Sequence, residues 1–187
     1  MENEGEIVAI KTENMNAVFS QLVKEIQIYP LLASVGFPRL IKKGVSAENG
    51  FIYIATNFLG PSLEDLANLC SRKFTLKTSL MIFYQMLERL EYMHSRNLIH
   101  RDIKPENIMM GLGDESDIVT MIDFGLCRSI IDPKTNKHIK FMGGKNLIGT
   151  CRFVSLNSHL GYELSRRDDL LTLCNMIVYF VRGNLPW

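Results

Sequence analysis

What the sequence lacks narrows the kind of protein it can encode. There are only four cysteines, and they are far apart, with no C-x-x-C pair: Cys70, Cys127, Cys151 and Cys174. This spacing argues against a zinc site or a disulfide framework and favours a reducing compartment. The first six residues are polar and acidic, unlike a secretory signal peptide. We therefore expect an intracellular protein, cytoplasmic or nuclear.

Long hydrophobic runs and an excess of one charge are also missing. The longest apolar stretch, residues 170–181, is about twelve residues long and is interrupted by Thr172 and Asn175. It is too short to span a bilayer and predicts a buried helix. The net charge of +1 creates no field that would attract nucleic acid or a membrane, so we expect neither as a partner.

Two short motifs carry the strongest chemical signal. An H-R-D sequence ends at Asp102, Asn107 follows five residues later, and a D-F-G sequence begins at Asp123. The motifs resemble those of protein kinases, and this resemblance implies that Asp102 accepts the proton of a substrate hydroxyl as that oxygen attacks a phosphate. Asn107 and Asp123 supply hard oxygen ligands suited to Mg²⁺. Lys104 can place an ammonium near the transferred phosphate, which makes Asp102 and Lys104 the candidate catalytic pair.

Together with V-A-I-K, which ends at Lys11, these motifs resemble the signature set of protein kinases. In that family the lysine holds the α- and β-phosphates of ATP, and a glutamate on the next helix orients the lysine. Glu25 matches that glutamate, since it lies in an apolar-periodic stretch from about Asn16 to Tyr29. The alternative for Glu25 is a solvated surface side chain.

Further runs resemble the casein kinase I family. They are LGPSLEDL from Leu59, SRKF from Ser71, KNLIGT from Lys145 and SRRDDL from Ser165. S-L-N at 155–157 stands where that family has S-I-N and most kinases have A-P-E. The resemblance covers residues 8–187.

This resemblance implies an α+β, protein-kinase-like fold with two lobes. A small β-rich lobe with one helix would comprise residues 1–58, and a mostly helical lobe residues 59–187. We expect the domain to be incomplete, because no glycine-rich G-x-G-x-x-G loop precedes the V-A-I-K strand and the family has further helices after residue 187. By the same resemblance the backbone of Asn57 and Leu59 would bind the adenine. Asp65 either faces the ribose or forms a capping box with Ser62 at the start of a helix.

The residue pattern predicts the order of elements. The expected strands cover residues 6–11, 37–43, 50–57, 108–110 and 118–122, and the expected helices cover 16–29, 78–96 and 165–181, with a shorter one after Ser62. Pro30 should end the first helix at Tyr29. Residues 123–157 are expected to form a long loop. By resemblance, Asp169 should bind the backbone of the H-R-D turn.

That long loop is basic. From residue 126 to 152 its only acid is Asp132, against six cations: Arg128, Lys134, Lys137, Lys140, Lys145 and Arg152. The loop could be a solvated basic surface or a docking surface for acidic or phosphorylated substrates, because Arg and Lys pair well with phosphate. Lys145 and Arg152 match the anion-contacting positions of the family that the chain resembles.

The resemblance implies a protein serine/threonine kinase. It would use ATP and Mg²⁺ to phosphorylate Ser or Thr of acidic or phosphate-primed protein substrates. Two alternatives remain open. One is a catalytically silent pseudokinase or gene fragment that acts as a binding scaffold. The other, which the motifs favour less, is a small-molecule phosphotransferase of kinase-like fold.

Overall fold

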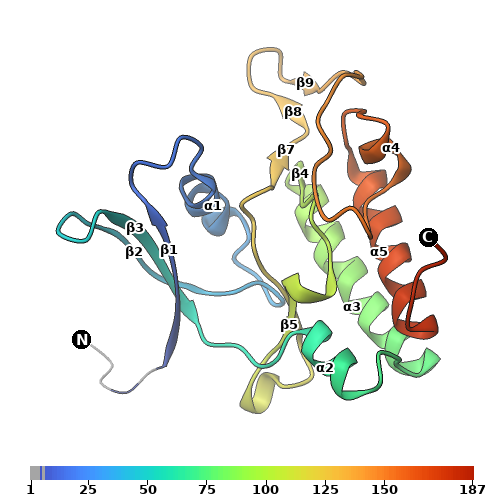
Figure 1. Cartoon of the computed structure of the whole chain (residues 1–187). Coiled ribbons are helices and arrows are strands. Elements are labelled where there is room, and N and C mark those ends of the chain that lie inside the picture. Colours follow the sequence, from blue (N-terminus) through green and yellow to red (C-terminus); the bar gives the residue numbers. More distant parts are fainter. Residues whose placement is uncertain (1–4, 6) are drawn as a thin grey trace.

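The computed structural model describes residue 5 and residues 7–187. The strand expected from residue 6 and the polar start of the chain therefore lie partly outside the described residues. A three-stranded sheet and one helix form a small lobe, and the other long helices form a second lobe beside it (Figure 1). This arrangement confirms the expected α+β fold with two lobes.

The elements have the following bounds. The helices are α1 Gln21–Ile28, α2 Leu63–Leu69, α3 Leu76–Ser95, α4 Leu156–His159 and α5 Arg166–Arg182. The strands are β1 Val8–Asn14, β2 Leu40–Ser46, β3 Phe51–Asn57, β4 Leu98–Ile99, β5 Ile108–Met110, β6 Val119–Met121, β7 Arg128–Ser129, β8 Ile131–Asp132 and β9 Lys137–His138. Short 3₁₀ turns occur at Tyr29–Leu31, Pro105–Asn107 and Gly113–Glu115.

The sheet of the small lobe is antiparallel in the order β1-β3-β2, with Lys11 opposite Ile54. Strand β2 begins at Leu40, whereas the sequence predicted a start at Phe37. Phe37 is instead buried between the lobes, where its ring lies 5.4 Å from that of Tyr92 and 6.1 Å from that of Phe124. Phe37 is therefore apolar because it packs in the core, and it does not belong to a strand.

Helix α1 begins at Gln21, and the prediction of a start near Asn16 is wrong. Ser20 is the N-cap, since its Oγ accepts a hydrogen bond from the Val23 amide at 3.1 Å. Val18 and Phe19, which contributed to the apolar pattern, are strongly exposed in the preceding loop. The helical end was predicted correctly: α1 stops at Ile28, and Pro30 lies in the following 3₁₀ turn.

Helices α3 and α5 pack side by side and form the core of the larger lobe (Figure 1). Helix α5 buries Leu173, Met176 and Phe180 on one face. Its other face leaves Leu171 and Val178 exposed, so the buried helix that the sequence predicted is buried on one face only. In the part of the chain that the structure describes, there is no helix with the length and apolar character needed to span a membrane.

Capping boxes begin α2 at Ser62 and α5 at Ser165, with Asp65 and Asp168 as the reciprocal acceptors. The segment 123–157 is not a plain loop, because it contains β7, β8 and β9. Strand β7 pairs with β4 directly before the H-R-D turn, while β8 and β9 form a short hairpin. The basic segment is thus anchored to the helical lobe at its first residues.

Candidate functional site

A cavity of about 310 Å³ lies between the two lobes. It is lined by six of the residues that the sequence singled out: Lys11, Glu25, Asn57, Leu59, Asn107 and Asp123. They come from β1, α1, the end of β3 and the segments around β5 and β6, so folding gathers residues from both lobes. Its other lining side chains are mainly apolar, among them Ile10, Ile54 and Met109, which is the usual character of a small-molecule pocket.

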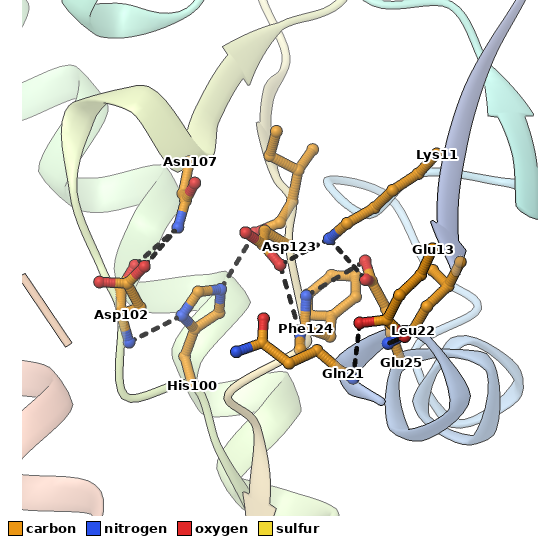
Figure 2. A network of polar contacts seen from close by, with 12 residues as sticks. Lys11, Glu13, Gln21, Leu22, Glu25, His100, Asp102, Asn107, Asp123 and Phe124 are labelled. Atoms are coloured by element: carbon orange, nitrogen blue, oxygen red, sulfur yellow. Dashed lines mark hydrogen bonds and ion pairs between the residues drawn. The ribbon is translucent and has the colours of Figure 1, made fainter. Parts of the chain in front are cut away.

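Lys11 lines this cavity and lies between the carboxylates of Glu25 and Asp123 (Figure 2). Its Nζ lies 2.7 Å from Glu25 Oε2 and 2.8 Å from Asp123 Oδ1. Burial alone would lower the pKa of Lys11, but hydrogen bonds to Asp123 and Glu25 outweigh this and raise the pKa above its ordinary value. Burial likewise opposes the ionisation of Asp123, yet the bond from Lys11 keeps the pKa of Asp123 below its usual range. Lys11 is therefore a fixed cation at neutral pH.

Glu25 is almost fully buried, and it has hydrogen-bond partners besides Lys11. Its Oε1 accepts a hydrogen bond from the Phe124 amide at 3.3 Å and one from the Tyr29 hydroxyl at 3.5 Å. The Tyr29 and Phe124 rings meet edge to face with centroids 5.4 Å apart. The glutamate thus joins α1 to the D-F-G segment, and the solvated-surface interpretation of Glu25 does not hold, since only 1% of its surface is exposed.

Asp102 follows strand β4 in the helical lobe and is bonded to three polar side chains. Lys104 Nζ donates to Asp102 Oδ2 at 2.7 Å, and Asn107 Nδ2 donates to the same oxygen at 3.1 Å. Thr150 Oγ1 donates to Asp102 Oδ1 at 2.8 Å. The sequence motifs predicted the grouping of Asp102 with Lys104 and Asn107, whereas the contact with Thr150 was missed, although that residue ends the KNLIGT run.

A buried carboxylate anchors the H-R-D turn from below. Asp169 Oδ2 accepts from the His100 amide at 2.9 Å, and Oδ1 accepts from the Arg101 amide at 2.9 Å. This confirms the contact expected for Asp169. Arg101 and Asp123 both adopt positive φ, +71° and +64°. Such conformations cost energy for residues with a side chain and persist where the surroundings enforce them, often at functional sites.

Asn107 and Asp123 fit a magnesium site completed by a nucleotide. The Asn107 amide nitrogen donates to Asp102, which leaves its carbonyl oxygen as the atom that could bind a cation. Among residue 5 and residues 7–187, no group of three or more His, Cys, Asp or Glu side chains is arranged to hold a metal. A metal here would therefore need phosphate oxygens besides these two protein ligands, a donor set that Mg²⁺ accepts.

The residues predicted to bind adenine and ribose have separate positions. Leu59 is buried at the cavity wall, and the Asn57 amide already donates to the Arg39 carbonyl at 3.2 Å. Any adenine contact of Asn57 would therefore use its carbonyl oxygen. Asp65 caps α2, where its Oδ2 accepts from the Ser62 amide at 3.0 Å. These bonds lower the pKa of Asp65, with the Ser62 hydroxyl contributing most; its contact with ribose stays a prediction.

The basic segment has an acidic partner that sequence inspection missed. Glu163 is buried and lies 2.6 Å from Arg128 Nη1 and 3.3 Å from Lys145 Nζ. Arg152 is exposed, and its guanidinium lies 4.5 Å from the centre of the Phe153 ring. Two of the six cations are thus paired within the fold, by an acid that comes after the segment in sequence. Asp132 is the only acid inside the segment, but Glu163 neutralises part of the segment's positive charge from outside it.

The chain matches the protein kinase domain family over residues 1–187 and belongs to that family. This membership agrees with the two-lobe fold and with the placement of Lys11, Glu25, Asn107 and Asp123 around one cleft, with Asp102 bonded to Asn107. It makes the chain a phosphotransferase of the kinase superfamily. Protein kinase domains generally use ATP and Mg²⁺ and act on protein substrates.

Proposed function

We propose that this chain is a casein-kinase-I-like serine/threonine kinase that phosphorylates acidic or phosphate-primed proteins. The observation that supports this most is the convergence of Lys11, Asp123 and Asn107 on one interlobe cavity, next to Asp102. Each of these residue types suits one requirement of phosphoryl transfer, namely phosphate contact, metal binding and proton acceptance. Positioning and charge stabilisation would supply most of the rate enhancement.

On the nucleotide side, Lys11 would hold the α- and β-phosphates of ATP while Glu25 keeps the ammonium in place. The Lys11–Asp123 contact of 2.8 Å would open on binding, since both side chains then have new partners. The apolar cavity wall would receive the adenine, with backbone groups of Asn57 and Leu59 at its edge. Asp65 would contact the ribose from the first turn of α2.

On the acceptor side, Asp102 would accept the proton of the substrate hydroxyl as its oxygen attacks the γ-phosphate. Lys104, at 2.7 Å from Asp102, would place a positive charge beside the transferred group. Asn107 and Asp123 would hold Mg²⁺ through their side-chain oxygens. When bound, Mg²⁺ neutralises the charge that develops on the phosphate oxygens. Thr150 would keep the Asp102 carboxylate turned toward the acceptor.

For the substrate preference, we propose that Lys145 and Arg152 contact acidic or phosphorylated side chains. Lys145 keeps 39% of its side-chain surface exposed despite its contact with Glu163, so it can still reach a ligand. The Arg152 guanidinium is exposed, and guanidinium groups bind phosphate in a bidentate manner. These residues flank Thr150 in sequence and hence lie on the segment that touches Asp102.

The experiment that tests this function is transfer of the labelled γ-phosphate of ATP to casein, followed by phosphoamino-acid analysis. We expect label on Ser or Thr with the parent chain and with the matched control Asp117→Asn, an exposed carboxylate in the turn before β6. Asp102→Asn should abolish nearly all label. A parent chain that binds Mg-ATP yet transfers nothing would support the silent scaffold, and label on tyrosine would contradict the proposed specificity.

A further inference from the structure

Strand β1 holds helix α1 at two points. Lys11 and Glu13 are two residues apart and therefore project from the same face of the strand. Lys11 reaches Glu25 in the middle of the helix at 2.7 Å. Glu13 reaches the beginning of the same helix, and Figure 2 shows its carboxylate beside the backbone of Gln21 and Leu22.

The Glu13 carboxylate completes the cap of α1. Its Oε1 accepts from the Gln21 amide at 3.1 Å, its Oε2 accepts from the Leu22 amide at 3.1 Å, and the Ser20 hydroxyl also donates to Oε2. The Ser20 oxygen in turn accepts from the Val23 amide. Three amides of the first turn are thereby bonded, and a negative charge lies at the positive end of the helix dipole. The Ser20 bond does most to lower the pKa of Glu13.

This capped turn lies directly against the D-F-G segment. A Cβ atom at Gly125 would lie 3.1 Å from Gln21 Cβ and 3.1 Å from Gln21 Oε1, so the absence of a side chain there permits the close approach. One turn further along α1, Glu25 accepts from the Phe124 amide. A shift of the start of α1 would therefore move Glu25 relative to Lys11 and to the Phe124 amide.

Helix α1 depends on such contacts because it is short. It spans eight residues, and helices of that length are marginal by themselves in water. Leu22 is buried in the core, and Ile26 and Ile28 pack against it partly buried, so apolar contacts hold the middle and the end of the helix. Its first turn is held to β1 by the polar cap.

We propose that Glu13 is a positioning residue that holds α1 so that Glu25 reaches Lys11 and Phe124. Glu13 lies outside the lining of the cavity, and apart from the attraction between its charge and that of Lys11 it acts on nucleotide binding through the helix. The role rests on the proposed function of Lys11 and Glu25 in binding ATP. The proposal predicts that the effects of Glu13→Gln and Glu25→Gln on nucleotide binding are not additive. Once Glu25 is neutral, the loss of Glu13 should have little further effect.

The test is a double-mutant cycle with Glu13→Gln, Glu25→Gln and the double variant. The first readout is the Kd of a fluorescent methylanthraniloyl-ATP with Mg²⁺. We expect Glu13→Gln to weaken binding about fivefold, which equals about 1 kcal/mol, the usual value of a lost helix cap. In the Glu25→Gln background the same change should leave the Kd unaltered. Equal losses in both backgrounds, or no loss in the parent background, would overturn the proposal.

A second readout needs no nucleotide. Hydrogen–deuterium exchange followed by NMR measures how well the Phe124 amide, which donates to Glu25, is protected. Glu13→Gln should speed the exchange of this amide clearly in the parent background, because Glu25 moves with the start of α1, and only slightly in the Glu25→Gln background. Equal acceleration in both backgrounds would mean that Glu13 does not act through Glu25.

The two readouts separate the two proposals. A parent chain that fails to bind the ATP analogue would refute the proposed function, while the exchange of the Phe124 amide would still decide the role of Glu13. Glu48→Gln removes an exposed charge from the turn between β2 and β3 and serves as the matched control. It should change neither readout, and an effect as large as that of Glu13→Gln would count against a specific role for Glu13.

Discussion

A buried carboxylate supports the site from each lobe, and the two are used differently. Asp169 in the helical lobe is 3% exposed and accepts from the backbone amides of His100 and Arg101, and its Oδ2 also lies 2.9 Å from Nε2 of His94. Glu25 in the small lobe is 1% exposed, but its main partner is the side chain of Lys11, which is 44% exposed. The helical lobe therefore fixes the H-R-D turn by bonds made on folding. The small lobe holds Lys11, the proposed phosphate contact, by an ion pair that is partly open to solvent.

The difference predicts that chemistry and nucleotide binding can be separated by mutation. In the proposed mechanism Asp102 faces the acceptor, so Asp102→Asn should lower kcat by about 10²–10⁴-fold, the usual contribution of a positioned acid–base group. The Kd of Mg-ATP should remain nearly the same. Steady-state transfer to casein and equilibrium nucleotide binding measure the two effects, and equal rates for variant and parent would remove Asp102 from the mechanism.

Substitution of the two buried carboxylates, Asp169 and Glu25, tests the difference between the lobes through protein stability. Asp169→Ala would leave the His100 and Arg101 amides without an acceptor and would remove the contact with His94. At about 1–3 kcal/mol for each amide, urea unfolding should show a loss of about 2–6 kcal/mol from the amides alone. Glu25→Gln keeps the shape of the side chain and leaves Lys11 its contact with Asp123, so its loss should be much smaller. Equal destabilisation by the two changes would contradict the division of roles between the lobes.

A smaller effect is expected on the substrate-facing side of the helical lobe. Charge reversal at Lys145 and Arg152 should raise KM for acidic or phosphorylated peptides about tenfold or more, since a hydrogen bond to a charged group is worth about 1.5–3 kcal/mol. KM for a neutral peptide should be unchanged. Reversal at Lys134 and Lys137, which are exposed around the β8–β9 turn, is the matched control. If acidic and neutral peptides respond alike, the segment is only a solvated basic surface.

The smallest effect concerns acid and the cap of α1. The pKa of Glu13 is lowered from its ordinary value of 4.5, so its stabilising effect is complete above that pH and disappears as the pH falls through the lowered value. At pH 7 Glu13→Gln should lower the melting temperature by about 2–4 °C, as expected for a lost cap of about 1 kcal/mol. This difference should shrink as the pH is lowered from 5 to 3. A difference that grows with acidity would be incompatible with the cap.

The helix starts show what the sequence could and could not predict. Helix α5 begins one residue after its predicted start, because its capping signal, Ser165 with Asp168, is local. Helix α1 begins at Gln21 instead of Asn16, because part of its cap comes from Glu13 on β1. The spacing of apolar residues along a helix contains no information about a capping residue on a separate strand. Val18 extended the apolar pattern but is exposed.

The site shows the same division. The contacts of Lys11 with Glu25 and of Asp102 with Lys104 follow from short motifs whose spacing is informative. The bond from Thr150 to Asp102 joins residues that lie 48 positions apart, and such a contact exists only once the chain has folded. The pairing of Glu163 with two cations of the basic segment was missed for the same reason, since charge counted along a segment omits acids that approach from elsewhere.

The central claim, that the two lobes together form a working Mg-ATP site, is tested most directly by thermal unfolding with saturating Mg-ATP. A ligand at one hundred times its Kd stabilises the folded state by about 2.7 kcal/mol, which is about 5–10 °C for a domain of this size. We expect this shift in the parent, no shift in Asp123→Asn, and a reduced shift in Lys11→Met. A melting temperature that Mg-ATP leaves unchanged in all three proteins would contradict the account.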